Sequence, residues 1–147
     1  MIDISSNTTV AFAVDTVVVA LEAAAVELQV KQLVGVLFCD TEEMLALNLR
    51  FRGVNESTDV LTFPSGSKEP LPLGDIAICV PFAKDQAELR GVTLENELIA
   101  LGVHGLLHLY GYDDIEDDDR AAMQKAMNDV GQKIGVQIDG AWTSILH

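Results

Sequence analysis

Hydrophobic and polar positions follow two different periods along the chain, and each period predicts a different kind of element. Short apolar runs bounded by Gly, Pro or polar residues are typical of strands, whereas apolar positions three or four residues apart are typical of helices. The pattern predicts strands over residues 8–13, 33–39, 58–64 and 73–80. It predicts helices over residues 15–30, from 40 to the turn at Gly53, and over 81–90, 93–110 and 116–134. Because these elements do not alternate regularly, we expect an α+β fold with about five helices packed on a small mixed sheet.

Several helix ends carry their own sequence signals. Asp40 and Glu43 have the spacing of a capping box, which opens a helix. The apolar residues of that helix are expected to face mostly the core: Met44, Leu45, Leu47 and Leu49. Pro81 suits the first turn of the next helix, and Gly91 ends it. The tail beyond Gly135 is expected to be weakly ordered.

The predicted 93–110 helix is hydrophobic nearly all round, which is typical of a helix at the centre of a core. Thr93 can cap its first turn. The longest uncharged apolar run, 98–112, has 15 residues, fewer than the ~20 needed to span a bilayer. The run is therefore interpreted as a central buried helix, and no association with a membrane is expected.

Length and composition predict one domain over residues 1–147, large enough to bury about two-thirds of its unfolded surface. Cys39 and Cys79 both lie in apolar runs and outside any CxxC or Cys/His cluster, which predicts buried reduced thiols. The first 15 residues contain no Lys or Arg for a secretory signal. A cytoplasmic protein is expected.

The net charge of −14, from 9 basic and 23 acidic residues, argues against broad non-specific attraction to nucleic acid. A polyanionic substrate would have to meet a local basic patch. Part of the acidic excess lies in the run 113–119, where carboxylates suit the start of the last helix.

His104 and His108 are four residues apart, so on a helix their rings leave one face from consecutive turns and can converge on one metal ion. Gly111 can end the helix, and Asp114 follows where a third ligand is expected. Three protein ligands and an open position are typical of a catalytic zinc site. The alternative is a pair of core histidines satisfied by backbone or water. Two of the chain's three histidines lie in this pair, which favours the metal site.

Three sequence blocks resemble the YbeY family of metal-dependent, single-strand-specific bacterial endoribonucleases. Residues 47–53 (LNLRFRG), with 58–64 (TDVLTFP), are similar to the family's LNxxYRG and T(D/N)VLSFP. Residues 73–78 (LGDIAI) form the second block. The third, 104–114 (HGLLHLYGYDD), is similar to HGxLHLxGYDH. The blocks occur in the family's order and cover most of residues 35–125.

The resemblance implies an endoribonuclease that acts in ribosomal RNA maturation and ribosome quality control, with single-stranded RNA, ribosomal RNA or ribosomal subunits as partners. The family's third metal ligand is histidine, and this chain has Asp114 instead. Asp binds zinc at a distance similar to that of His, so a site of His104, His108 and Asp114 is expected for Zn²⁺. The harder oxygen ligand also suits Mn²⁺ or another divalent ion. Asp113 and the terminal His147 are the substitute ligands.

Arg52 matches the arginine of the family's YRG and is the expected catalytic cation, because a guanidinium can hold two phosphate oxygens at once. Its alternative is a solvated charge at a helix end. Arg50 is interpreted as such a solvated charge. Asp59 and Asp75 are expected to be turn residues or to orient a histidine ring through a hydrogen bond.

Two other functions compete with the nuclease. The spacing HxxxHxxGxxD is also that of zinc peptidases, but Gly105 stands where those enzymes have their general base, a glutamate. The chain could instead be a non-catalytic module that binds ribosomes or protein partners through its acidic surface, with a metal site that has decayed.

Overall fold

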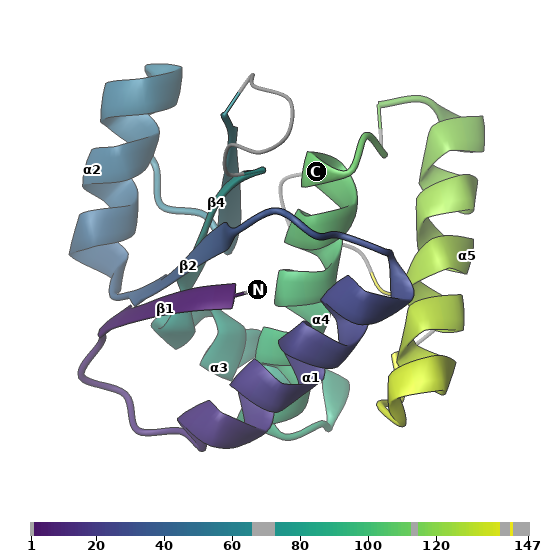
Figure 1. Cartoon of the computed structure of the whole chain (residues 1–147). Coiled ribbons are helices and arrows are strands. Elements are labelled where there is room, and N and C mark those ends of the chain that lie inside the picture. The colour runs from purple at the N-terminus through teal and green to yellow at the C-terminus, as the bar shows by residue number, and fades with distance from the viewer. Residues whose placement is uncertain (1, 66–72, 113–114, 139–141, 143–147) are drawn as a thin grey trace.

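A mixed sheet of four strands lies at the centre of the protein (Figure 1). The computed structural model describes residues 2–65, 73–112, 115–138 and 142. The strands are β1 (Ile2–Asn7), β2 (Val34–Cys39), β3 (Val60–Pro64) and β4 (Gly74–Cys79). Their order across the sheet is β1-β2-β4-β3, with β1, β2 and β4 parallel and β3 antiparallel to β4. The sheet is therefore mixed, as predicted.

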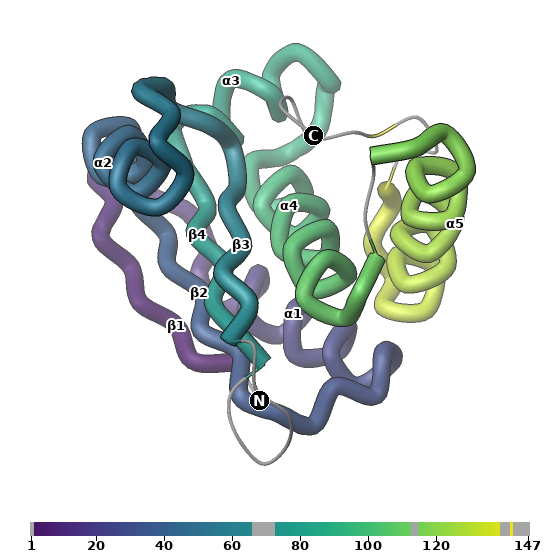
Figure 2. Tube along the Cα trace, turned by 90° about the horizontal axis from the view of Figure 1, so that it is seen from above, coloured from purple at the N-terminus to yellow at the C-terminus, as the bar shows by residue number. Residues whose placement is uncertain are grey.

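Helices cover both faces of this sheet (Figure 2). Within the described residues they are α1 (Val14–Glu27), α2 (Thr41–Arg52), α3 (Val80–Arg90), α4 (Leu94–Leu109) and α5 (Asp117–Ile134). Helix α2 lies on one face, α1 and α4 lie on the other, and α5 packs on α1 and α4. The α+β fold is confirmed, and each predicted helix is present within a few residues of its expected ends.

Helix α4 is the centre of the core, as its apolar sequence predicts, and twelve of its sixteen residues are buried. The Thr93 hydroxyl caps it by accepting a hydrogen bond from the backbone N–H of Asn96 at 3.1 Å. A side chain at Gly102 would lie 2.4 Å from Leu21 of α1. The absence of a Cβ at residue 102 therefore lets α1 and α4 pack closely.

The first strand is not where the sequence pattern placed it. β1 spans Ile2–Asn7, and the predicted strand at 8–13 is a loop. Phe12 in that loop packs on Phe38 of β2, with ring centroids 4.9 Å apart. Val10 and Phe12 thus reach the core without strand geometry. β1 forms because it pairs in parallel register with β2, a tertiary interaction that outweighs its polar composition.

The capping box at Asp40 is also absent, although α2 begins where it was predicted. The Asp40 carboxylate accepts hydrogen bonds from the Thr8 hydroxyl and from the backbone N–H of Thr9 (3.0 Å), and makes no bond to its own helix. It joins the loop after β1 to the end of β2. Leu49 was expected to face the core but is 50% exposed. The buried residues of α2 are Met44 and the polar Asn48.

Among the described residues after α5, Ile138 and Trp142 are buried in the core, although weak order was expected beyond Gly135. Ile138 is 9% exposed and Trp142 is 4% exposed. Cys39 and Cys79 are buried and free, as expected. In the part of the chain that the structure describes, no helix combines the length and the apolar character needed to cross a membrane.

Candidate metal centre

His104 and His108 lie in the last two turns of α4, and their rings face each other. The two Nε2 atoms are 3.0 Å apart, and the ring centroids are 4.5 Å apart with an interplanar angle of 79°. His104 is 3% exposed, whereas His108 is half-buried. The helix spacing therefore brings the two predicted ligands together, with the buried ring behind and the more exposed ring beside solvent.

The distance between the two Nε2 atoms suits a shared ion. Two imidazole nitrogens on a tetrahedral zinc ion, each at its usual bond length, are about 3.3 Å apart. The observed separation is 3.0 Å, and a small rotation of either ring would bring the two atoms to the zinc-bound distance. The same separation lets one Nε2–H donate to the other Nε2 when the first carries the proton. A metal ion bound between the rings would displace that proton, and both Nε2 lone pairs would then face the ion.

The third ligand predicted from the sequence, Asp114, lies outside the described residues, as do its substitutes Asp113 and His147. The described residues contain no cluster of three His, Cys, Asp or Glu side chains able to hold a metal ion. Helix α4 does end just before Asp114. Gly111 has a φ of 115°, and the Tyr112 N–H donates to the Leu107 carbonyl at 2.9 Å. The chain therefore turns where the sequence predicted a turn.

A cluster that the sequence did not reveal contacts the buried histidine through Trp142. The Trp142 ring lies 5.3 Å from the His104 ring, and its Nε1–H donates to both carboxylate oxygens of Glu97 at 2.7 and 3.1 Å. Arg90 Nε lies 3.2 Å from Glu97 Oε1. Burial raises the pKa of the Glu97 carboxyl, while the Trp142 hydrogen bond and the Arg90 charge lower it. The spacing of Glu97 and His104, seven residues, was the sequence signal for a shared helix face.

Gly105 argues against a peptidase on steric grounds as well as by its residue type. A Cβ at residue 105 would lie 2.8 Å from a side-chain carbon of Ile76 in β4. A glutamate there would be directed into the contact between α4 and the sheet. The position of the peptidase general base is thus occupied by the core, and a Gly105→Glu substitution would disrupt packing rather than supply the base.

Arg52 lies at the end of α2, on the sheet face opposite α4 (Figure 2). It is exposed. Phe51 packs edge-on against Phe63 with ring centroids 5.2 Å apart, which places the end of α2 beside the last residues of β3. Pro64, the last residue of β3, pairs with Gly74 of β4. A Cβ at Gly74 would touch Leu109 of α4, so this end of the sheet lies beside the end of α4. Arg52 and the histidine end of α4 thus share one end of the sheet, on opposite faces.

Asp59 and Asp75, each expected to be a turn residue or to orient a histidine ring, lie in different environments. Asp59 is 2% exposed, and its carboxylate accepts hydrogen bonds from the Val60 N–H (2.8 Å) and the Thr58 hydroxyl (3.2 Å). Its proposed role toward a histidine stays a prediction. Asp75 cannot have that role, because Ile76 faces Gly105 of α4 and successive strand residues point to opposite faces.

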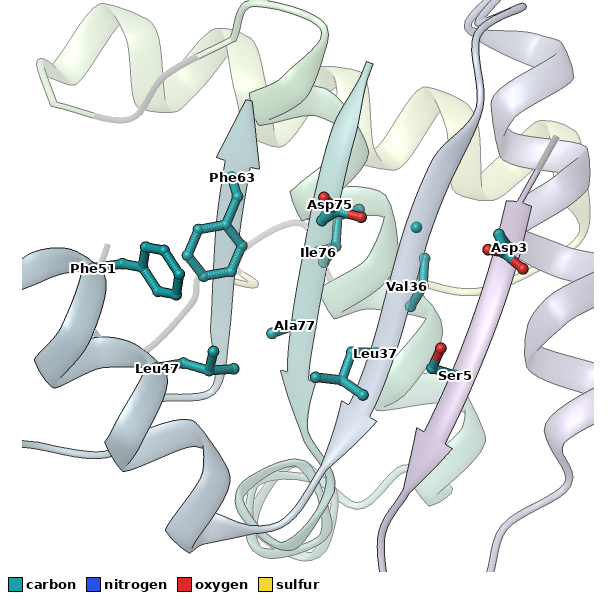
Figure 3. Close-up of a pocket in the computed structure, with 11 residues that line it drawn as sticks. Asp3, Ser5, Val36, Leu37, Leu47, Phe51, Phe63, Asp75, Ile76 and Ala77 are labelled. Atoms are coloured by element: carbon teal, nitrogen blue, oxygen red, sulfur yellow. The ribbon is translucent and has the colours of Figure 1, made fainter. Parts of the chain in front are cut away.

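The Asp75 side chain instead lines a cavity of about 420 Å³ on the face of the sheet that α2 covers, opposite α4 (Figure 3). In one row across the sheet, Asp3, Gly35, Asp75 and Phe63 are register partners. The Asp75 carboxylate lies where a side chain at Gly35 would otherwise stand. The prediction that Asp75 orients a histidine is therefore wrong, and strand alternation is the reason.

Comparison with known proteins gives a consistent match. The sequence model of one family, described as "Endoribonuclease YbeY", matches residues 2–135. A protein named Endoribonuclease YbeY from Caldanaerobacter subterraneus subsp. tengcongensis is 37% identical over 118 residues, which cover 71% of this chain and 75% of that protein. One of the same name from Acinetobacter baylyi is 37% identical over 120 residues, or 76% of each chain. The solution structure of a Thermotoga maritima protein aligns with a TM-score of 0.67 and 28% identity, covering 91% of this chain and 89% of the other.

Proposed function

Because the chain belongs to the YbeY family, we propose that it is a metal-dependent endoribonuclease that cuts single-stranded RNA during ribosomal RNA processing and ribosome quality control. The observation that supports the metal site is the pair of facing Nε2 atoms of His104 and His108, 3.0 Å apart on α4. The proposed place of action is the cytoplasm, with ribosomal RNA or ribosomal subunits as partners and further protein partners on the acidic surface.

The histidines would hold the ion through Nε2, and Asp114 is the proposed third ligand. When bound, Zn²⁺, or Mn²⁺ as the harder alternative, would supply Lewis-acid activation of water and charge stabilisation at the phosphate. The protein's part is to direct the Nε2 atoms of both imidazoles toward one point. His104, at 3% exposed, excludes water from the rear of the site, so that the substrate would approach past His108.

Arg52 is the proposed cation for the scissile phosphate. Arg52 ends α2 at the end of the sheet that the histidine end of α4 also reaches, so an RNA strand that crosses this end would meet both. In a chain with a net charge of −14, a local positive group would offset the repulsion between the protein and a polyanion. A guanidinium can hold two phosphate oxygens and offset the charge that builds on them.

The activity is tested with a labelled single-stranded RNA and the matching duplex, with Zn²⁺ or Mn²⁺ and with EDTA. We expect cleavage of the single strand only, abolished by EDTA and by His104→Ala or His108→Ala. Arg52→Glu should lower the cleavage rate about 100-fold or more and leave the metal content unchanged. Arg50→Glu is the matched control, because Arg50 lies over the Phe51 ring at 5.2 Å and has no proposed catalytic role.

Metal analysis of protein purified without chelators separates this proposal from a non-catalytic partner-binding module. One equivalent of metal, lost in His104→Ala, supports the enzyme. Protein that takes up no divalent metal and leaves RNA intact would favour the module. Asp114→His should tighten metal binding, and an unchanged affinity for zinc would argue against Asp114 as the third ligand.

A further inference from the structure

Trp142 lies beyond the family match, which ends at residue 135. The side chain is 4% exposed and contacts Glu97 in the first turn of α4. Its Nε1–H is shared between Glu97 Oε1 at 2.7 Å and Oε2 at 3.1 Å. A hydrogen bond to both oxygens of one carboxylate fixes the plane and the direction of the indole.

The group that receives this bond is itself held in place. Glu97 is 1% exposed, and a buried carboxylate is stable only when it is paired and hydrogen-bonded. Arg90 supplies the pairing charge, with Nε 3.2 Å from Glu97 Oε1, and its guanidinium lies over the Trp142 ring at 5.3 Å from the centroid. Arg90, Glu97 and Trp142 therefore each contact the other two.

The indole is also in contact with the candidate metal ligand. Its ring centroid is 5.3 Å from that of His104, at an interplanar angle of 58°, and His108 lies 4.5 Å from His104. Glu97 and His104 are seven residues apart, about two turns on one helix face. The Trp142 side chain bridges these two turns, with its N–H on the carboxylate and its ring on the imidazole.

We propose that Trp142 is a positioning residue: its indole fixes the ring of His104 toward His108, and Glu97 with Arg90 fixes the indole. This inference rests on the metal site of the proposed function. A ligand ring that is already oriented loses less rotational freedom when an ion binds, so the affinity for metal rises. Loss of a group that orients a metal ligand commonly lowers metal affinity by roughly 10–100-fold.

The first experiment compares the zinc affinity of variants, measured by competition with a chromophoric chelator. Trp142→Ala should bind Zn²⁺ about 10-fold more weakly than the wild type. Trp142→Phe keeps a ring beside His104 but loses the N–H to Glu97, so its affinity should lie between the two. Ile138→Ala is the control for loss of core packing, because Ile138 is also buried beyond α5, at 9% exposed, and should keep wild-type affinity.

The second experiment uses the unmodified protein, in which Trp142 is the single tryptophan. Ni²⁺ or Co²⁺ bound by His104 would lie beside the indole and should quench its fluorescence to a saturating end point at one equivalent. His104→Ala should abolish this quenching. In NMR spectra of the metal-free protein, cross-relaxation is expected between the indole protons and the His104 ring protons.

The outcomes distinguish the two proposals. If the wild type binds zinc and Trp142→Ala binds it equally well, the positioning role is refuted while the metal site stands. Equal weakening by Ile138→Ala would also refute it, since general loosening of the core would then explain the effect. If the wild type binds no divalent ion, the metal site of the proposed function fails and the positioning role fails with it.

Discussion

At the scale of single residues, burial decides the chemistry of the two thiols. Cys39 and Cys79 are register partners at the ends of β2 and β4, and both are 0% exposed. Burial, reinforced by the neighbouring Cys79 sulfur, raises the pKa of Cys39 to about 12. Burial also raises the pKa of Cys79. Thiolates are the reactive form, so both cysteines should be inert in the folded protein.

We therefore expect a disulfide reagent such as dithionitrobenzoate to release almost no chromophore from the native protein at pH 8. After denaturation in guanidinium, two thiols per chain should react. Rapid reaction of one equivalent under native conditions would contradict the buried, protonated state.

At the scale of elements, the Asp40 carboxylate fastens the loop that follows β1 to the end of β2. The Thr8 hydroxyl bond, together with the Thr9 N–H bond, lowers the pKa of Asp40. A carboxyl with a lowered folded pKa stabilises the fold fully above its unfolded pKa. That stabilisation is lost as the pH falls through the folded pKa. The joint between β1 and β2 should accordingly loosen in acid.

Asp40→Ala should lower the melting temperature at pH 7, because the Thr8 and Thr9 groups lose their acceptor. The difference between wild type and variant should shrink as the pH falls below about 4, where the carboxyl also becomes protonated in the unfolded chain. Melting curves recorded from pH 7 to pH 3 measure it. As a control, Glu42→Ala removes an exposed carboxylate from the first turn of α2, two residues after Asp40. A difference independent of pH would show that the charge of Asp40 is not what holds the loop.

At the scale of the whole molecule, the proposed site links α4 to the segment that carries Trp142, so that metal binding and folding should be coupled. An ion that binds only the folded chain, at a free concentration of 100 times its dissociation constant, stabilises the chain by about 2.7 kcal/mol. For a chain of 147 residues, this raises the melting temperature by roughly 5–10 °C.

Differential scanning fluorimetry with added Zn²⁺ and then EDTA measures this coupling. The wild type should show a reversible rise in melting temperature, and His108→Ala should show none. A rise of equal size in His108→Ala would place the stabilising ion elsewhere on the acidic surface.

How much the sequence could predict depended on whether the signal was local. The four-residue spacing of His104 and His108 fixed their common face, because helix geometry is set by the backbone alone. The apolar character of residues 98–109 likewise predicted a buried helix. The prediction that Asp75 orients a histidine failed, because a short apolar run does not reveal which alternate residues of the strand face α4.

Contacts between distant segments needed the tertiary structure. β1 is a strand because β2 lies beside it, and Asp40 bonds to Thr8 and Thr9 instead of capping its own helix. Neither interaction leaves a periodic trace in the sequence.

The sequence by itself therefore determined the family, the order of the elements and the pairing of the two histidines, since all three depend on residues close together in the chain or on motifs in a fixed order. Only the tertiary structure decided which sheet face each side chain joined and that Trp142 packs behind His104. The reason is that burial of a long-range contact depends on the geometry of both partners, and neither partner's own segment carries that information.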